Sequence, residues 1–173
     1  VSTYLGFWGT WYQGIAKTNK ALDCLKRFGQ MSDEDKIRLE AEIKFVRASL
    51  YFDLVKRYKD IIIYDEDLLA YNKDKAVSTE AEAWEFIYQD LKFAADNLPA
   101  REAAKGRINK GMAWAFMTRA MLYAQRWEDV KTAAEAVESL GYGLEANYAD
   151  SYSKAINAGN NEAIIQYLFD RAN

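Results

Sequence analysis

The chain has 173 residues, half of them hydrophobic, with 23 basic and 26 acidic side chains and a formal net charge of -3. This length is enough for one domain with a sizeable core, and the mixed, slightly acidic charge disfavours binding to nucleic acid. A single proline and nine glycines leave little material for the turns of an all-β fold, whereas long helices need neither residue. The composition therefore favours an all-α protein.

The first predicted helix runs from about Gly9 to Phe28 and ends at Gly29. Its apolar side carries Trp8, Trp11, Tyr12, Ile15, Leu22 and Leu25. Asn19 falls on the same side, where an unbonded buried amide would cost about 1–3 kcal/mol. We therefore expect the Asn19 side chain to tie neighbouring backbone together rather than to bind a ligand.

The second predicted helix begins after Ser32, a good N-cap, with three acids in its first turn. It carries two apolar stripes at helical spacing, displaced by roughly half a turn of 3.6 residues. They are Leu39, Ile43, Val46, Leu50, Leu54 and Ala41, Phe45, Ala48, Phe52, Val55. A surface helix needs one apolar face, so two opposed stripes predict a helix packed between neighbours on both sides.

Arg47 lies between these two stripes. We expect its guanidinium to leave the apolar seam and pair with a carboxylate or with helix-end carbonyls, fixing how this helix meets its neighbour. A role in anion recognition is the alternative.

The helical period is lost from Ile61 to Lys75, which predicts a connection with a short extended segment at Ile61 to Tyr64. Thr79 and Glu82 then form the capping box of a third helix, which ends near Pro99. Its core stripe is Trp84, Ile87, Leu91, Ala94 and Leu98.

Asn109 is predicted to cap a fourth helix, from about Lys110 to Gln125, and a fifth runs from Trp127 to Leu140 before Gly141. The pair resembles a degenerate tetratricopeptide repeat. Its core positions are Ala113, Phe116, Met117 and Ala120, then Trp127, Val130, Ala134 and Val137. The sequence thus predicts stacked antiparallel helix pairs with Trp84 and Trp127 buried at inter-helix seams, and little β structure outside Ile61 to Tyr64 and Ala163 to Leu168.

The sequence gives little support for catalysis, a cofactor or a metal. It contains no histidine, the commonest general base and a frequent metal ligand. There is no Gly-rich phosphate loop and no G-x-S-x-G motif. The acidic runs at 33–35 and 65–67 lack the spaced oxygen ligands and central glycine of a calcium loop. We expect a protein that is not an enzyme and holds no cofactor or metal.

An ordered series of short motifs runs along residues 11 to 165. It consists of Ala41-Glu42, Phe45-x-Arg47-Ala48, Tyr51-Phe52-x-Leu54-Val55, Tyr58, Trp84-Glu85-x-Ile87-Tyr88-x-Asp90-Leu91-x-x-Ala94-x-x-x-Leu98-Pro99, Gly106-Arg107-x-Asn109-Lys110-Gly111-x-Ala113, Tyr123, Trp127, Gly141-Tyr142-x-Leu144, Tyr148 and Asn161-Glu162-x-Ile164-Ile165. In this order the series resembles SusD/RagB-type proteins, the surface glycan-binding lipoproteins of certain Gram-negative outer membranes. One departure is Lys59-Asp60-Ile61-Ile62, where that family usually has Gly-Asp-Val-Pro.

The resemblance implies a SusD-like helical core that binds an oligosaccharide or other nutrient and acts with a TonB-dependent, SusC-like outer-membrane transporter. It further implies a lipid-anchored protein at the cell surface. We expect residues 1–173 to form one helical-repeat region, an internal fragment of a longer SusD-like protein whose lipid anchor lies outside this chain. No run of about 18 apolar residues is present, and Cys24 lacks the preceding hydrophobic segment of a lipidation site.

Trp8, Trp11 and Tyr12 are the glycan-binding candidates, because they form an aromatic cluster and aromatic rings stack on sugars. Their helical spacing also fits burial in the core, which is the commoner role of such residues. In the resembled family most sugar contacts lie outside the repeat helices, so we expect this chain alone to bind glycans weakly. A repeat scaffold that mediates only protein–protein interaction stays open as an alternative, and an all-helical glycosidase is a distant third.

Overall fold

The structure is a computed structural model that describes residues 2–66, 74–100, 106–152 and 162–165, with side chains described for 6–66, 74–100, 106–151 and 162–165. Over these ranges the chain forms five α-helices and one short 3-10 helix. They are α1 (Ser2–Phe28), α2 (Asp33–Tyr58), α3 (Glu80–Asn97), α4 (Lys110–Tyr123), α5 (Trp127–Ser139) and η2 (Tyr148–Tyr152). No strand occurs among the described residues, so the predicted all-α class is confirmed.

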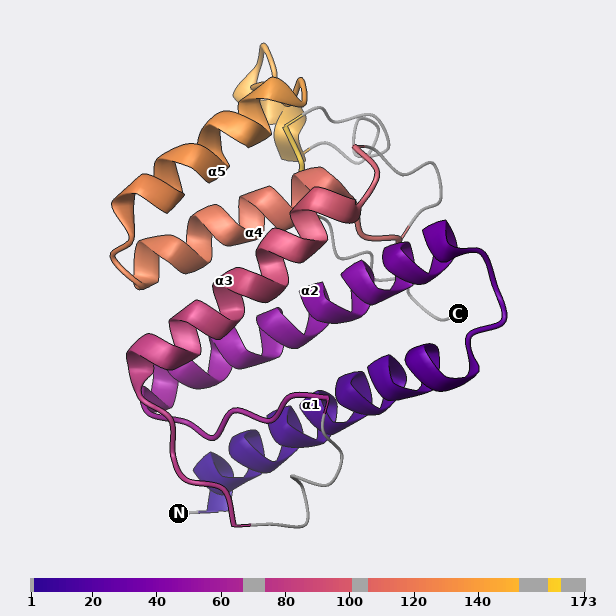
Figure 1. Cartoon of the computed structure of the whole chain (residues 1–173). Helices are drawn as coiled ribbons and strands as arrows, with labels where there is room; N and C mark the ends of the chain where they lie inside the picture. The colour runs from indigo at the N-terminus through magenta and orange to yellow at the C-terminus, as the bar shows by residue number, and fades with distance from the viewer. Residues whose placement is uncertain (1, 67–73, 101–105, 153–161, 166–173) are drawn as a thin grey trace, which may run out of the picture.

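The five helices stack in chain order, with α1 and α5 at opposite ends of the array (Figure 1). Each helix packs on the next one, and α2 contacts both α1 and α3. The sequence prediction of a helix packed on two sides is therefore confirmed for α2. Among the residues of the two predicted stripes, only Val46 is exposed, at 40%.

Side chains at the helix starts satisfy backbone N–H groups that have no partner within the helix. The Ser32 side chain accepts a hydrogen bond from the Asp35 N–H, and Asn109 accepts one from Met112. The Thr79 and Glu82 capping box is complete. These predicted caps are confirmed, while three helix bounds differ: α1 begins earlier, at Ser2, and α4 and α5 end slightly earlier than expected.

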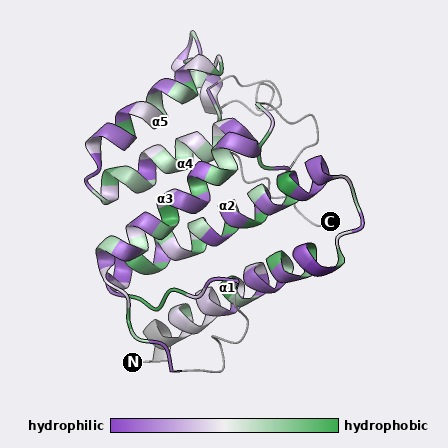
Figure 2. Cartoon of the chain, in the orientation of Figure 1, coloured by the Kyte–Doolittle hydropathy of each residue, from purple (hydrophilic) through white to green (hydrophobic). Residues whose placement is uncertain are grey.

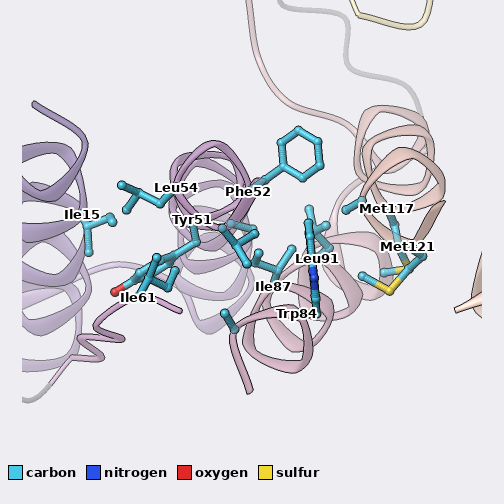
Figure 3. Close-up of a cluster of buried hydrophobic side chains, with 14 of the residues drawn as sticks. Ile15, Tyr51, Phe52, Leu54, Ile61, Trp84, Ile87, Leu91, Met117 and Met121 are labelled. Atoms are coloured by element: carbon cyan, nitrogen blue, oxygen red, sulfur yellow. The ribbon is translucent and has the colours of Figure 1, made fainter. Parts of the chain in front are cut away.

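The main core contains side chains from α1, α2, α3 and α4 and from the connection after α2 (Figure 3). Its largest fully buried apolar members are Ile15, Tyr51, Leu54, Ile61, Ile87, Leu91, Met117 and Met121. All five predicted core residues of α3 are buried, Trp84 included. Burial of each large side chain is worth about 1.5–3 kcal/mol, so this cluster accounts for much of the stability of the stack.

The connection after α2 turns sharply and then runs alongside α1 (Figure 1). Lys59 makes the turn at a φ of 61°, a backbone region that side chains with a Cβ rarely adopt. The predicted extended segment makes a single antiparallel bridge between Ile61 and Ser78. Of the second predicted segment, Ala163 to Ile165 contain no strand, and 166–168 lie outside the described residues.

The α4–α5 pair forms the last layer of the array. Gly111, in the first turn of α4, lies directly under the Tyr142 ring, and Gly141 adopts a left-handed conformation at a φ of 77°. The predicted burial of Trp127 is wrong, because 62% of this residue is exposed. The physical reason is its position: among the described helices α5 contacts only α4, so none of the others covers its first residue.

Hydrophobic residues are distributed over all five helices in short stretches between polar ones (Figure 2). In the part of the chain that the structure describes, no helix has both the length and the apolar character needed to cross a bilayer.

Candidate functional site

A cavity of about 360 Å³ lies between α1 and the connection that follows α2. It is lined by Trp8, Gly9, Tyr12, Gln13, Ala16, Ile62 and Tyr64. The α1 residues recur at spacings of one and four, which places them on one helix face. Two of the three candidates from the sequence, Trp8 and Tyr12, therefore line the same cavity.

The aromatic rings of the cavity hold one another in place. The centroids of Trp8 and Tyr12 lie 4.8 Å apart, and Tyr12 and Tyr64 meet edge to face at 5.9 Å. Trp8 also meets Tyr58 edge to face at 4.9 Å. Such pairs are worth about 0.5–1.5 kcal/mol each beyond the area they bury, so these rings are ordered before any ligand arrives.

Two tyrosine hydroxyls fix the other wall of the cavity. The Tyr12 hydroxyl donates to the Ile62 carbonyl at 2.8 Å and accepts from the Ile62 N–H at 2.9 Å. The Tyr51 hydroxyl does the same with Tyr64, at 2.8 Å and 2.7 Å. For one residue of the extended segment, each hydroxyl thus makes the two backbone hydrogen bonds that a neighbouring strand would make, which explains how the segment holds its shape beyond its bridge to Ser78.

A buried polar cluster anchors the end of this segment. The Arg47 guanidinium donates to both Asp90 carboxylate oxygens, at 2.7 and 2.8 Å, and to the Asn19 amide oxygen at 2.7 Å. It also lies 3.2 Å from the Glu66 carboxylate. The Asn19 amide nitrogen in turn donates to the Tyr64 carbonyl at 3.0 Å.

These contacts decide two predictions made from the sequence. Asn19 ties neighbouring backbone together, as expected. Arg47 pairs with a carboxylate, as expected, but it stays in the helix seam with a side-chain exposure of 2% rather than leaving it. Burial opposes ionisation of Glu66, but the charge and hydrogen bond of Arg47, a backbone hydrogen bond and the charge of Lys26 together outweigh burial and hold the Glu66 pKa below its usual range.

The third candidate, Trp11, faces away from the cavity lining. It meets Phe7 edge to face at 5.5 Å, and the Arg57 guanidinium lies 5.8 Å from its ring. Its Nε1–H is buried without a hydrogen-bond partner among the described residues. Trp11 is therefore a packing residue of the α1–α2 seam in this structure.

Sequence reasoning missed Ile62 and Tyr64 as part of the site. It placed them in an extended segment, but only the fold brings that segment against α1. Tyr12 and Ile62, for example, are in contact although 50 residues separate them in the sequence. The available signal was the aromatic side chain of Tyr64 in a stretch without helical period.

The cavity lining fits ring stacking better than bond cleavage or metal binding. None of its residues is a carboxylate, so it contains no acid–base pair of the kind that glycoside hydrolysis uses. Within the described ranges there is no group of three potential metal ligands. An aromatic, open cavity with one amide side chain can accommodate a small ring-shaped polar molecule.

The fold is a stack of helix pairs that carries an aromatic cavity on α1. The chain belongs to the SusD-like family, because residues 1–122 match the family model described as starch-binding associating with outer membrane. Proteins of this family bind carbohydrates and are not catalysts.

Individual relatives agree with this assignment. A SusD-like protein of Bacteroides ovatus is 26% identical over 175 residues, covering 92% of this chain and 32% of the relative. A SusD-like protein of Bacteroides fragilis has a solved structure with a TM-score of 0.83 and 32% identity, covering 96% of this chain and 34% of that one. A laminarin binding SusD-like protein gives a TM-score of 0.80 at 27% identity, covering 92% and 36%. The chain spans about a third of the length of these relatives.

Proposed function

We propose that this chain is the helical core of a non-enzymatic surface protein that binds glycans for an outer-membrane nutrient-uptake system. The observation that carries the proposal is the preorganised aromatic cavity on α1, found in a chain of the SusD-like family. The laminarin binding relative supports glycan as the ligand class. A lipid anchor at the cell surface and a TonB-dependent transporter as partner are further parts of the proposal, carried by family membership.

The geometry supports weak binding of one sugar ring. The Trp8 and Tyr64 rings offer apolar faces, and the Gln13 amide and the Trp8 Nε1–H are open to hydrogen bonding because neither makes a side-chain hydrogen bond within the described part of the chain. The Tyr12 hydroxyl is already engaged with Ile62 and contributes only its ring. A single subsite of this size supports a Kd of about 1 mM, or roughly -4 kcal/mol.

Gly9 provides a direct test of the cavity. A Cβ added at Gly9 would meet no atom within 4 Å, so a larger side chain there would enter the cavity without disturbing the core. Glycine inside a helix costs about 1 kcal/mol relative to alanine, so Gly9→Leu is expected to fold at least as well as the natural chain.

The experiment is ligand-observed NMR titration of the full chain with a panel of neutral and acidic oligosaccharides that includes laminari-oligosaccharides. We expect millimolar binding of at least one glycan, lost in Gly9→Leu and retained in Trp127→Ala, the control at the far end of the array. Absence of binding, or binding that Gly9→Leu leaves intact, would overturn the cavity as the glycan site.

The alternative of a protein–protein scaffold is favoured by one observation. Large apolar residues are exposed at the α4–α5 end: Leu122 is 46%, Tyr123 51% and Trp127 62% exposed.

The transporter proposal is tested by tagging the protein in its source organism and identifying what co-purifies from detergent-solubilised outer membranes. A TonB-dependent transporter is expected; its absence, with the tagged protein present in that fraction, would contradict the partnership.

A further inference from the structure

Lys75 is a half-buried cation next to the cavity. Its Nζ lies 5.7 Å from the centroid of the Tyr64 ring, and that ring lines the cavity. Among the residues that the structure describes, no carboxylate lies within ion-pair distance of Lys75. The contact with Tyr64 is thus a cation–π interaction with no counter-ion among the described residues.

Three other half-buried cations have carboxylate partners. The Lys44 ammonium lies 2.8 Å from Glu40, and Lys56 lies 2.9 Å from Asp53. Arg107 lies 2.7 Å from Glu42. Withdrawing a charge from water is costly unless an opposite charge compensates it, so a half-buried lysine without such a partner favours the arrival of an anion.

The cavity itself supplies no competing negative charge, because all of its lining residues are uncharged. The polar groups left open are mainly donors: the Trp8 Nε1–H, the amide N–H groups of Gln13 and the three N–H groups of Lys75. A donor-rich rim beside stacked rings suits a ligand that combines an apolar ring face with acceptor oxygens carrying negative charge.

We propose that the cavity on α1 is a subsite for an acidic sugar, a uronate or a sulfated pyranose. The sugar ring stacks on Trp8 and Tyr64, and its carboxylate or sulfate group pairs with Lys75. This inference rests on the proposed glycan-binding function and specifies the class of glycan.

The test compares matched probes that differ in charge. The full chain is titrated with oligogalacturonate and its methyl ester, and with a carrageenan oligosaccharide and its desulfated form. We expect at least one acidic probe to bind about tenfold more tightly than its neutral counterpart, a difference of about 1.4 kcal/mol. The two pairs separate carboxylate from sulfate recognition. The preference for the acidic probe should decrease as the NaCl concentration is raised from 0.05 to 1 M, since salt screens exposed charges.

Variants assign the preference to Lys75. Lys75→Gln is expected to abolish the preference for the acidic probe over its neutral counterpart, and Lys75→Arg to keep it. Gly9→Leu is expected to abolish binding of every probe. Lys131→Gln is the matched control, because it removes the same charge from an exposed position on α5. Equal binding of acidic and neutral probes, or a preference that survives Lys75→Gln, overturns the acidic-sugar inference alone. Lack of any glycan binding overturns it together with the proposed function.

Discussion

Arg47 and Asp90 join α2 to α3 through two parallel hydrogen bonds, with Nε to Oδ2 at 2.7 Å and Nη2 to Oδ1 at 2.8 Å. Both side chains are almost fully buried, at 2% and 6% exposure. The Arg47 guanidinium also lies 4.8 Å from the Phe86 ring. The pair therefore fixes the register of two helices at the point where the extended segment is anchored.

Removing one partner of this pair should be costly. Asp90→Ala removes the bidentate partner of the buried Arg47 charge, and such losses cost about 3–5 kcal/mol. Urea denaturation measures the change. Asp96→Ala on the same helix is the control, because its ion pair with Lys92 is exposed and should contribute under about 1 kcal/mol. Similar effects of the two variants would contradict a structural role for the Arg47 and Asp90 pair.

Trp84 and Trp127 should respond in opposite ways to truncation. Trp84 is 6% exposed and Trp127 is 62% exposed. We expect Trp84→Ala to lose about 3–5 kcal/mol of unfolding free energy and Trp127→Ala to lose under about 1 kcal/mol. Chemical denaturation of both variants checks this, and a loss above about 3 kcal/mol in Trp127→Ala would restore the burial that the sequence suggested.

The features that were predicted correctly from the sequence are those that depend on local sequence pattern. Caps at Ser32, Thr79 and Asn109 follow from short-range backbone geometry, and the α3 core stripe follows from helical period. The sequence could not predict that Trp127 stays exposed, since that depends on how many helices the array contains. Nor could it place Tyr64 against α1, because that contact arises from the path of a connection without regular structure.

Lys59 occupies a turn where the resembled family usually has glycine. Its φ of 61° is strained for a residue with a Cβ, and the chain holds it there because the Lys59 N–H bonds to the Val55 carbonyl at 2.9 Å. Lys59→Gly should therefore raise the unfolding free energy by about 0.5–1 kcal/mol. Lys17→Gly, in the exposed interior of α1, is the control and should lower it by about 1 kcal/mol. Destabilisation by both variants would show that Lys59 is unstrained.

Gly111 and Tyr142 form a close contact between two of the family motifs. A Cβ at Gly111 would lie 2.7 Å from Cζ of the Tyr142 ring, so one of the two has to shift. Gly111→Ala is expected to cost about 1 kcal/mol or more in the natural chain. In a Tyr142→Ala background the same change should instead gain a few tenths to 1 kcal/mol, because alanine is the better helix former. A double-mutant cycle measured by thermal unfolding checks this sign reversal, and additive effects would contradict the contact.

Tyr12 should make the protein sensitive to alkali. Burial raises the pKa of its hydroxyl to about 12, with the Ile62 backbone hydrogen bond opposing the shift and Tyr64 adding to it. The unfolded chain ionises near 10, so it loses this proton before the folded protein does. Stability contributed by the neutral hydroxyl is complete below pH 10 and is lost as the pH rises toward 12.

Tyr12→Phe separates this titration from packing. The variant loses two hydrogen bonds to Ile62 and should be less stable at pH 8 by about 1–3 kcal/mol. Its stability should then fall less steeply between pH 10 and 12 than that of the natural chain, because the group responsible is gone. Tyr148→Phe is the control, since Tyr148 is 77% exposed and its removal should leave the slope unchanged. Urea unfolding midpoints measured between pH 10 and 12 give the pH dependence of stability for each protein. The same pH dependence in Tyr12→Phe and the natural chain would show that the Tyr12 hydroxyl does not hold the cavity wall.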